Sequence, residues 1–124
     1  MTKKVNIIVT QPPYGKEDAY GAIPMAASQV AAGNEASLIF ASGGVHSIVK
    51  GQKTGYGDVS VWLKDVPTVE SEITKNIDVV NFFALDRDVE KRGISDDEII
   101  DGIKKISLDK LTDMILEADV NLVF

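Results

Sequence analysis

The 124-residue sequence contains 44% hydrophobic and 26% charged residues, no cysteine, and a formal net charge of −6. These values predict one soluble domain over residues 1–124, with no disulfide, no thiolate metal site and no apolar run long enough to cross a membrane. The negative charge argues against nucleic acid as the main partner, because phosphate binding depends on clustered lysine and arginine.

The beginning of the chain carries no predicted targeting segment. Residues 1–4 read Met-Thr-Lys-Lys, and the apolar run that follows is shorter than the hydrophobic region of a secretory signal peptide. Together with the lack of cysteine, this predicts a cytoplasmic location.

Strands and helices are predicted to alternate in the first half of the chain. Residues 4–10 are rich in β-branched side chains and end before Pro12 and Pro13, which predicts a strand. A helix is predicted from Glu17 to the Gly33-Asn34 pair, and Pro24 within it predicts a kink or a late helix start. Residues 35–41 form the second predicted strand, and a glycine turn and a short helix over residues 45–49 follow it.

The segment 52–67 shows no clear helical period. Glycines surround Tyr56, and an alternation of apolar and polar residues that includes Trp62 follows. The pattern allows a loop, an extra edge segment, or a surface completed by another subunit. Tyr56 and Trp62 are either packed under a long loop or act as interface anchors.

The second half of the chain continues the alternation. A helix or turn over residues 66–75 precedes a strand over residues 77–84 and a short charged helix that ends near Gly93. The sequence Ser95-Asp96-Asp97-Glu98 is a capping box that predicts a short helix. A brief strand over residues 103–107, a helix capped by Ser107 and a last strand over residues 119–124 complete the chain, with the C-terminus expected inside the sheet. In the helix capped by Ser107, one apolar stripe is predicted to face the core: Leu108, Leu111, Met114, Ile115 and Ala118.

Alternation at this spacing predicts a three-layer α/β/α fold with a mostly parallel sheet covered on both faces. In such sheets, binding sites form where the strands end and the helices begin. Three turns are therefore expected to meet at the C-terminal edge of the sheet and to line a cleft: residues 10–15, 42–46 and 84–88.

The candidate ligand-binding residues lie in these three turns: Tyr14, Gly43, Gly44, His46, Asp86, Arg87 and Asp88. The two glycines match no nucleotide fingerprint, so they serve either a sharp turn or a small anion at the next helix. The lone histidine has no nucleophile at motif spacing, and the two aspartates suit the start of a helix as well as acid–base chemistry. Acid–base catalysis by His46 with Asp86 or Asp88 stays a third hypothesis. No catalytic residue, metal or cofactor is assigned.

The order of motifs resembles the DsrE/DsrF-like family of small sulfur-relay proteins, which includes TusC- and TusD-type subunits. The resemblance spans nearly the whole chain, and it is carried by Pro13-Tyr14-Gly15 with Glu17-Asp18-Ala19-Tyr20, by Ser42-Gly43-Gly44-Val45 with Lys50-Gly51-Gln52, by Arg92-Gly93-Ile94, and by Ser107-Leu108-Asp109-Lys110-Leu111 with Ala118-Asp119 and Phe124. It implies a five-stranded parallel sheet and assembly into homotrimers or into hexamers of related subunits.

The same resemblance implies a sulfur-carrying cysteine in the turn before the Arg-Gly helix end. This sequence has Leu85-Asp86-Arg87-Asp88 there, and a carboxylate cannot carry sulfane sulfur. We therefore expect a cysteine-less member without persulfide sulfurtransferase activity of its own, acting as a structural or binding subunit beside a cysteine-bearing relative or sulfur acceptor. The alternative is a homo-oligomer that binds a small ligand or anion in the cleft.

Overall fold

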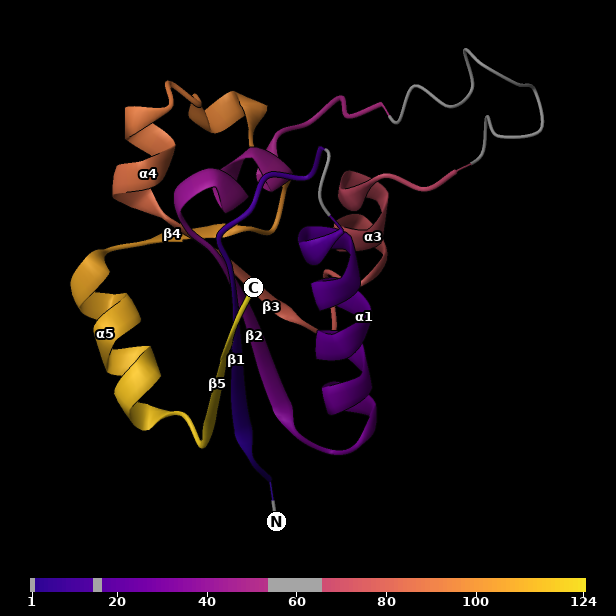
Figure 1. Ribbon diagram of the computed structural model, residues 1–124, viewed down its shortest axis with the longest axis vertical. Coiled ribbons are helices and arrows are strands. Elements are labelled where there is room, and N and C mark those ends of the chain that lie inside the picture. The colour runs from indigo at the N-terminus through magenta and orange to yellow at the C-terminus, as the bar shows by residue number, and fades with distance from the viewer. Residues whose placement is uncertain (1, 15–16, 54–65) are drawn as a thin grey trace.

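The chain is organised around a five-stranded sheet in which all neighbouring strands are parallel (Figure 1). The computed structural model describes residues 2–14, 17–53 and 66–124. The strands are β1 (Lys4–Val9), β2 (Glu35–Phe40), β3 (Asn81–Leu85), β4 (Lys104–Ile106) and β5 (Val120–Val123), in the spatial order β4-β3-β2-β1-β5. The predicted α/β class with a parallel sheet is confirmed.

Helices lie on both sides of the sheet. Figure 1 shows α1 and α3 on one side of the strands and α5 on the other, with α4 near the end where β3 stops. The α-helices within the described residues are α1 (Asp18–Ala31), α3 (Val69–Lys75), α4 (Asp86–Lys91) and α5 (Leu108–Glu117). The 3₁₀ segments within the same residues are η1 (Ser42–Ile48) and η3 (Asp96–Glu98).

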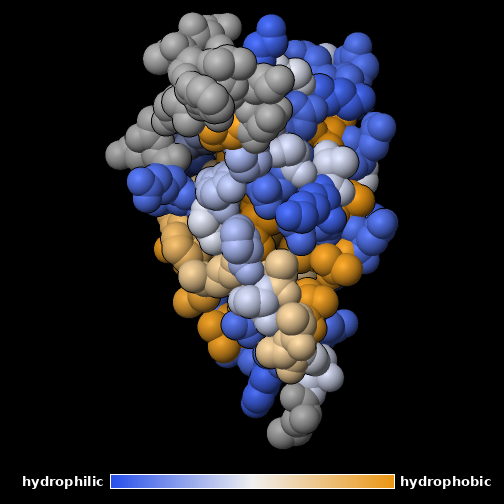
Figure 2. Space-filling view, turned by 90° about the vertical axis from the view of Figure 1, so that its right-hand side faces the viewer, coloured by the Kyte–Doolittle hydropathy of each residue, from blue (hydrophilic) through white to orange (hydrophobic). Residues whose placement is uncertain are grey.

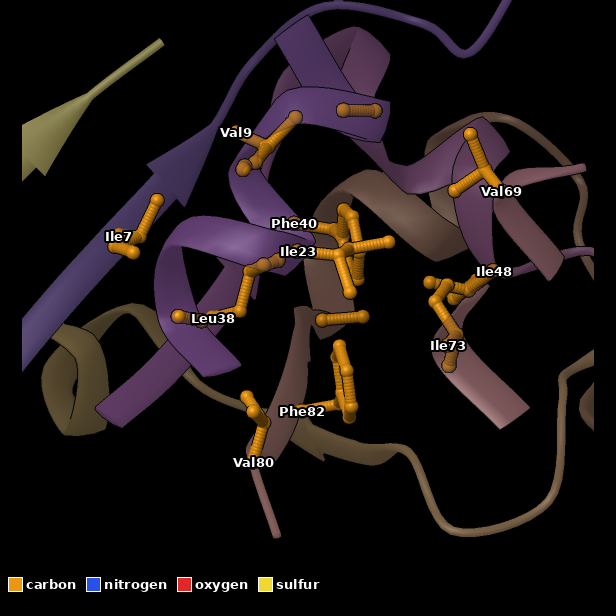
Figure 3. Packing of buried hydrophobic residues seen from close by; sticks show 14 of the residues in the cluster. Ile7, Val9, Ile23, Leu38, Phe40, Ile48, Val69, Ile73, Val80 and Phe82 are labelled. Carbon is orange, nitrogen blue, oxygen red and sulfur yellow. The ribbon is translucent and has the colours of Figure 1, made fainter. Parts of the chain in front are cut away.

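The main core fills the space between the sheet and α1 with α3. Alternate strand residues face this side, so Leu38 and Phe40 of β2 are fully buried beside Ile23 of α1 (Figure 3). The rings of Phe40 and Phe82 stack at a centroid distance of 6.4 Å across β2 and β3. This core holds β1, β2 and β3 in place, and because the strands are parallel, their C-terminal turns lie at the same end of the sheet.

The α5 side of the sheet carries a smaller core. Ile8, Ile39 and Leu85 form it with Ile106 and with Leu111 of α5. Of the predicted apolar stripe on α5, only Leu111 is buried, while Leu108 and Ile115 are 46% and 37% exposed. The stripe was therefore only partly right, because this face of the sheet offers fewer apolar partners than the stripe contains.

A polar row interrupts the α5 side near the start of the strands. Asn121, Asn6, Ser37 and Asn81 are in register across β5, β1, β2 and β3. Asn6 is buried, and its Nδ2 donates to Met114 O at 2.9 Å and to Asn121 Oδ1 at 3.0 Å. These bonds join β1, β5 and the end of α5.

Hydrophobic and hydrophilic side chains gather at different ends of the α1 side of the molecule. In Figure 2 this side faces the viewer, and hydrophobic side chains gather toward the end that holds the N-terminus, whereas the described part of the other end is mostly hydrophilic. The C-terminal turns of β1, β2 and β3 lie at this more polar end (Figure 1).

Several predicted element limits were wrong. Helix α1 starts at Asp18 and runs through an exposed Pro24, so the late start was wrong. Strand β3 starts at Asn81 rather than residue 77, because the Val79 and Val80 N–H groups donate to Asn76 O and close a turn after α3. The helix expected after the glycine turn begins earlier, as the 3₁₀ segment η1.

The C-terminal half held two further differences. The capping box at Ser95 is present, but it opens only the three-residue segment η3, after which Ile99 forms an antiparallel bridge with Val49. The C-terminal strand joins the sheet at its edge, with all four residues of β5 exposed. The terminal Phe124 donates to Ile8 O and packs, partly buried, against the main core, so the C-terminus belongs to the sheet, as predicted, but at its edge. The proposals for residues 54–65, including Tyr56 and Trp62, lie outside the described residues.

Candidate functional site

The first two predicted turns are in direct contact. A Cβ atom added to Gly44 would lie 2.1 Å from Val9 O, and one added to Gly43 would lie 3.1 Å from Thr10 O. Neither glycine has a positive φ, so both are required for close approach rather than for backbone conformation. The Gly44 N–H donates to Ala41 O, which accounts for that donor within the turn itself.

The third turn is tied to the second by a buried carboxylate. Asp88, in the first turn of α4, is 8% exposed, and its Oδ2 accepts a 2.7 Å hydrogen bond from Ser42 N. Ser42 has a φ of 52°, the left-handed region that a serine rarely adopts. Arg87 and Arg92 approach Asp88 Oδ1 only at 4.0 and 3.9 Å. The Asp88 carboxylate therefore holds the strained start of η1 in place.

Two of the predicted site residues line a hollow beside these turns. Tyr14 and His46 both border a space of about 560 Å³. Both side chains are exposed, and Lys50, which also lines the hollow, places its Nζ 3.5 Å from Asp101 Oδ1. The complete lining is Pro12, Tyr14, His46, Val49, Lys50, Gly51 and Gln52. An imidazole and an ammonium group beside a tyrosine ring can accept a small anion that has an apolar part.

The other predicted residues do not line this hollow. Gly43, Gly44, Asp86, Arg87 and Asp88 belong to the three joined turns but are absent from its lining. Within residues 2–14, 17–53 and 66–124, His46 makes no hydrogen bond or ion pair with Asp86 or Asp88. The structure thus brings the three turns together. His46 lines the hollow, whereas Asp86 and Asp88 do not.

A reciprocal clamp that sequence analysis missed builds one wall of the hollow. Glu70 Oε1 accepts from Gly51 N and Gln52 N, both at 2.9 Å, while Gln52 Oε1 accepts from Glu70 N at 3.0 Å. The Gln52 Nε2 group also donates to Ser47 O and Val49 O. No short-range pattern could have revealed this clamp, because Gln52 and Glu70 are 18 residues apart and most of the segment of unclear periodicity lies between them.

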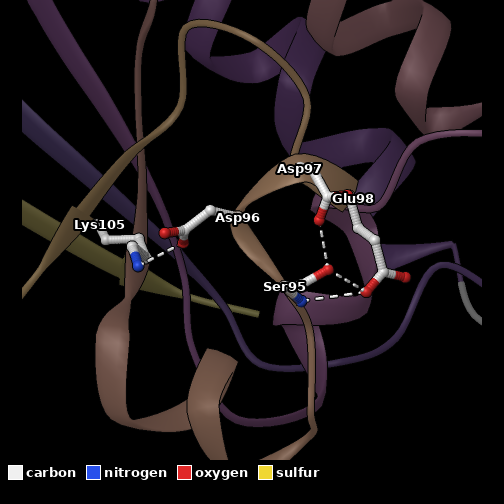
Figure 4. Close-up of polar contacts among 5 residues, drawn as sticks. All are labelled: Ser95, Asp96, Asp97, Glu98 and Lys105. Carbon is white, nitrogen blue, oxygen red and sulfur yellow. Dashed lines mark hydrogen bonds and ion pairs between the residues drawn. The ribbon is translucent and has the colours of Figure 1, made fainter.

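The same wall is supported from the connection between α4 and β4. Lys50 N donates to Glu98 O at 2.8 Å, and Ile100 N donates to Ile48 O at 2.9 Å. Figure 4 shows how this connection is fastened: Glu98 Oε1 accepts from Ser95 N and Ser95 Oγ, and Lys105 Nζ contacts Asp96 Oδ1 at 2.6 Å. These contacts connect Lys50 to the turn that precedes β4.

The polar contacts of this connection shift three side-chain pKa values. The backbone N–H and then the hydroxyl of Ser95 lower the pKa of Glu98. The Ser95 hydroxyl lowers the pKa of Asp97, and the hydrogen bond with Asp96 raises the pKa of Lys105. All three groups are therefore held in their charged forms at neutral pH.

A family model matches residues 3–124, described as the DsrE/DsrF-like family. The chain belongs to the DsrE/DsrF-like family. Two solved structures share the fold of this DsrE/DsrF-like chain. The YchN protein from E. coli is 24% identical with a TM-score of 0.81, and each chain is covered completely. MTH1491 from Methanobacterium thermoautotrophicum, a protein of unknown function, is 16% identical with a TM-score of 0.66, over 98% of this chain and 99% of its own. No curated protein matches the sequence.

The described residues contain neither a helix able to span a membrane nor a cluster of metal-ligating side chains. None of the described helices of this DsrE/DsrF-like chain has the length and apolar character needed to cross a membrane. Within the same residues, no three histidine, aspartate or glutamate side chains are grouped so that they could hold a metal ion.

Proposed function

We propose that this DsrE/DsrF-like chain is a non-catalytic structural or binding subunit of a sulfur-relay type system in the cytoplasm. One observation carries the proposal: these 124 residues contain no cysteine. The chain belongs to the DsrE/DsrF-like family, and its resemblance to that family implies a sulfur-carrying thiol after β3. A persulfide needs a thiolate, and neither a carboxylate nor a guanidinium replaces it.

The local structure after β3 supports a structural use of that turn. Asp88 is hydrogen-bonded to Ser42 N, and Asp86 stands at the start of α4, where a carboxylate opposes the helix dipole. The chain therefore contributes a shaped surface, and sulfur would be carried by a cysteine-bearing relative or by an acceptor protein. Copies of this chain assemble with one another as a homotrimer or homohexamer in this proposal.

Affinity purification of the tagged chain from its native host tests the relay role. Mass spectrometry of the eluate should identify a cysteine-bearing DsrE/DsrF-like subunit or a sulfur acceptor, enriched over a tag-only purification. Arg87→Ala, which changes an exposed residue of the third turn, should reduce this enrichment, whereas Thr74→Ala on the exposed surface of α3 should not. A homo-oligomer that repeatedly elutes without such a protein would remove the relay role.

The hollow lined by Tyr14 and His46 favours a second candidate function. In this alternative, the chain is a homo-oligomer that binds a small molecule or an anion at the C-terminal edge of the sheet, near Gly43, Gly44, Asp86, Arg87 and Asp88. The observation that favours it is that His46 and Lys50 both line the same open space.

Titration with inorganic phosphate or sulfate tests this second candidate. The imidazole signals of His46 should shift and saturate in nuclear magnetic resonance spectra, and Lys50→Gln should weaken the effect, while Lys75→Gln on α3 should leave it unchanged. A shift that grows linearly without saturation, or equally in both variants, would count against a binding site here.

A further inference from the structure

The α5 side of the sheet is polar along the first half of its three central strands and apolar along the second half. Alternation places polar side chains of β1, β2 and β3 on this side before apolar ones: Lys4, Asn6, Glu35, Ser37 and Asn81, then Ile8, Ile39, Phe83 and Leu85. Strands of a parallel sheet are usually apolar on both faces, because helices cover both. On this side lies α5 (Figure 1), and its Leu111 and Met114 pack against the apolar half. Packing therefore accounts for the apolar half but not for the polar half.

A hollow of about 180 Å³ lies over the polar half, between the end of α5 and the starts of β1, β2 and β3. We call it the strand-start hollow, and its polar lining is formed by Lys4, Asn6, Glu35, Ser37, Asn81 and Glu117. It lies at the opposite end of the strands from the hollow lined by Tyr14 and His46. An inference from it is therefore independent of both proposed functions.

Asn6 presents an unpaired amide oxygen to this hollow. The residue is only 5% exposed, and its Nδ2 donates to Met114 O at 2.9 Å, which fixes the amide orientation because a carbonyl oxygen can only accept. The second Nδ2 hydrogen is bonded to Asn121 Oδ1 at 3.0 Å. The other arm of the amide, Oδ1, accepts no hydrogen bond from the described part of the chain. Because a buried amide oxygen without a donor is costly, this position favours a hydrogen-bond donor in the hollow.

The remaining polar side chains of the hollow are also uncommitted. Among the residues that the structure describes, Ser37 and Asn81 form no side-chain hydrogen bond, and Glu35 and Glu117 form no ion pair. Two carboxylates and the single ammonium group of Lys4 give this lining one net negative charge. A buried acceptor beside two carboxylates is complementary to a positively charged donor.

We propose that the strand-start hollow binds a small organic molecule through a primary ammonium group. An ammonium group has three donors and no acceptor, so it can bond Asn6 Oδ1 and the Glu117 carboxylate together. Ser37 and Asn81 offer hydrogen bonds to the rest of the molecule, and Lys4 offers a partner for a carboxylate, which an amino acid has and a simple amine lacks. The volume is below the roughly 300–1,000 Å³ of sites for drug-sized ligands, which favours a molecule of amino-acid size.

Titration with free lysine, 1,5-diaminopentane and hexanoate tests this proposal. The first two compounds carry ammonium groups, whereas hexanoate has an apolar chain and a carboxylate only. The side-chain amide signals of Asn6 and Asn81 should shift and saturate in nuclear magnetic resonance spectra with both ammonium compounds and should not change with hexanoate. Tighter binding of lysine that Lys4→Gln abolishes would identify an amino acid as the ligand. Equal or tighter binding of 1,5-diaminopentane would identify a simple amine.

Two variants and one matched control locate the binding. Glu117→Gln and Asn81→Leu should each weaken the binding of 1,5-diaminopentane by about three- to tenfold, because each removes one polar partner. Asp113→Asn is the control: Asp113 is exposed one turn earlier on α5, undergoes the same loss of charge and does not line the hollow, so binding should be unchanged. Circular dichroism confirms that each variant is folded.

The proposal is overturned if neither ammonium compound gives a saturating shift or if hexanoate gives the same shifts. It is also overturned if Glu117→Gln and Asp113→Asn weaken binding equally, because the ammonium compounds would then be attracted to the acidic surface in general. The purification experiment of the relay role and the phosphate titration at His46 are unaffected by any of these results.

Discussion

The hydrogen bond between Asp88 and Ser42 gives the sharpest test of how the three turns are joined. Replacing Asp88 with alanine leaves the Ser42 N–H without its acceptor, next to a backbone held at a φ of 52°. A hydrogen bond to a charged group contributes about 1.5–3 kcal/mol. The two arginines add little, because they lie 3.9–4.0 Å from the carboxylate and their side chains are 30% and 54% exposed. We expect Asp88→Ala to lower the free energy of unfolding by about 2 kcal/mol.

Urea unfolding followed by circular dichroism measures this loss. With an m value of about 2 kcal/mol per molar urea, the midpoint should fall by about 1 M. Asp88→Asn separates the two contributions, because an amide oxygen can still accept from Ser42 N while the charge is removed. It should retain more than half of the stabilisation.

Asp86→Ala is the matched control. Asp86 is half-buried at the first position of α4, and within the described residues no hydrogen bond to its side chain is present. Its replacement should cost no more than about 1 kcal/mol, from the helix dipole. If Asp88→Asn were as destabilising as Asp88→Ala, ion pairing rather than the hydrogen bond would be the main contribution, and the reasoning above would be refuted.

Three further predictions concern the other supports of the site. Gly44→Ala should strongly lower the midpoint of thermal unfolding, because the added methyl group would lie 2.1 Å from Val9 O. Gly21→Ala is the control: no atom lies within 4 Å of its added Cβ, so it should stabilise α1 by up to about 1 kcal/mol. Gln52→Ala removes three side-chain hydrogen bonds that hold the wall of the hollow and should accelerate amide exchange at residues 51 and 70. Unchanged exchange at these two residues would contradict the clamp. The lowered pKa of Glu98 means that its carboxylate stabilises the η3 connection above pH 4.5 and ceases to do so as the pH falls through the lower folded value. The amide signal of Ser95 should follow that acid transition, and Glu98→Gln should abolish it.

The order of elements was predictable because each one depends on local chemistry. Ser107 caps α5 by accepting from Lys110 N, and Ser95 and Glu98 form the predicted capping box. The β-branched and aromatic runs of β1, β2 and β3 identify buried strands. Because parallel strands end at one edge of the sheet, the meeting of the three turns followed from this order as well.

What could not be predicted depends on contacts between distant parts of the chain. The start of β3 depends on how α3 ends at Asn76, and the need for Gly44 arises from Val9 in another strand. The clamp between Gln52 and Glu70 connects two residues with no shared pattern. The exposure of β5 depends on its place in the sheet, which a strand of Val-Asn-Leu-Val cannot reveal by itself.

The amide pair of Asn6 and Asn121 has a consequence for how the last strand finds its place. A slip of β5 by two residues along β1 would keep the same side chains on the same faces, so apolar burial alone discriminates poorly between the two alignments. Such a slip would separate Asn121 from Asn6 and remove one of the two hydrogen bonds that the buried Asn6 amide donates, at a cost of about 1 kcal/mol. The polar pair therefore helps to set the register of β5 against β1 during folding. A chain with leucine at both positions would exchange between the two registers more readily.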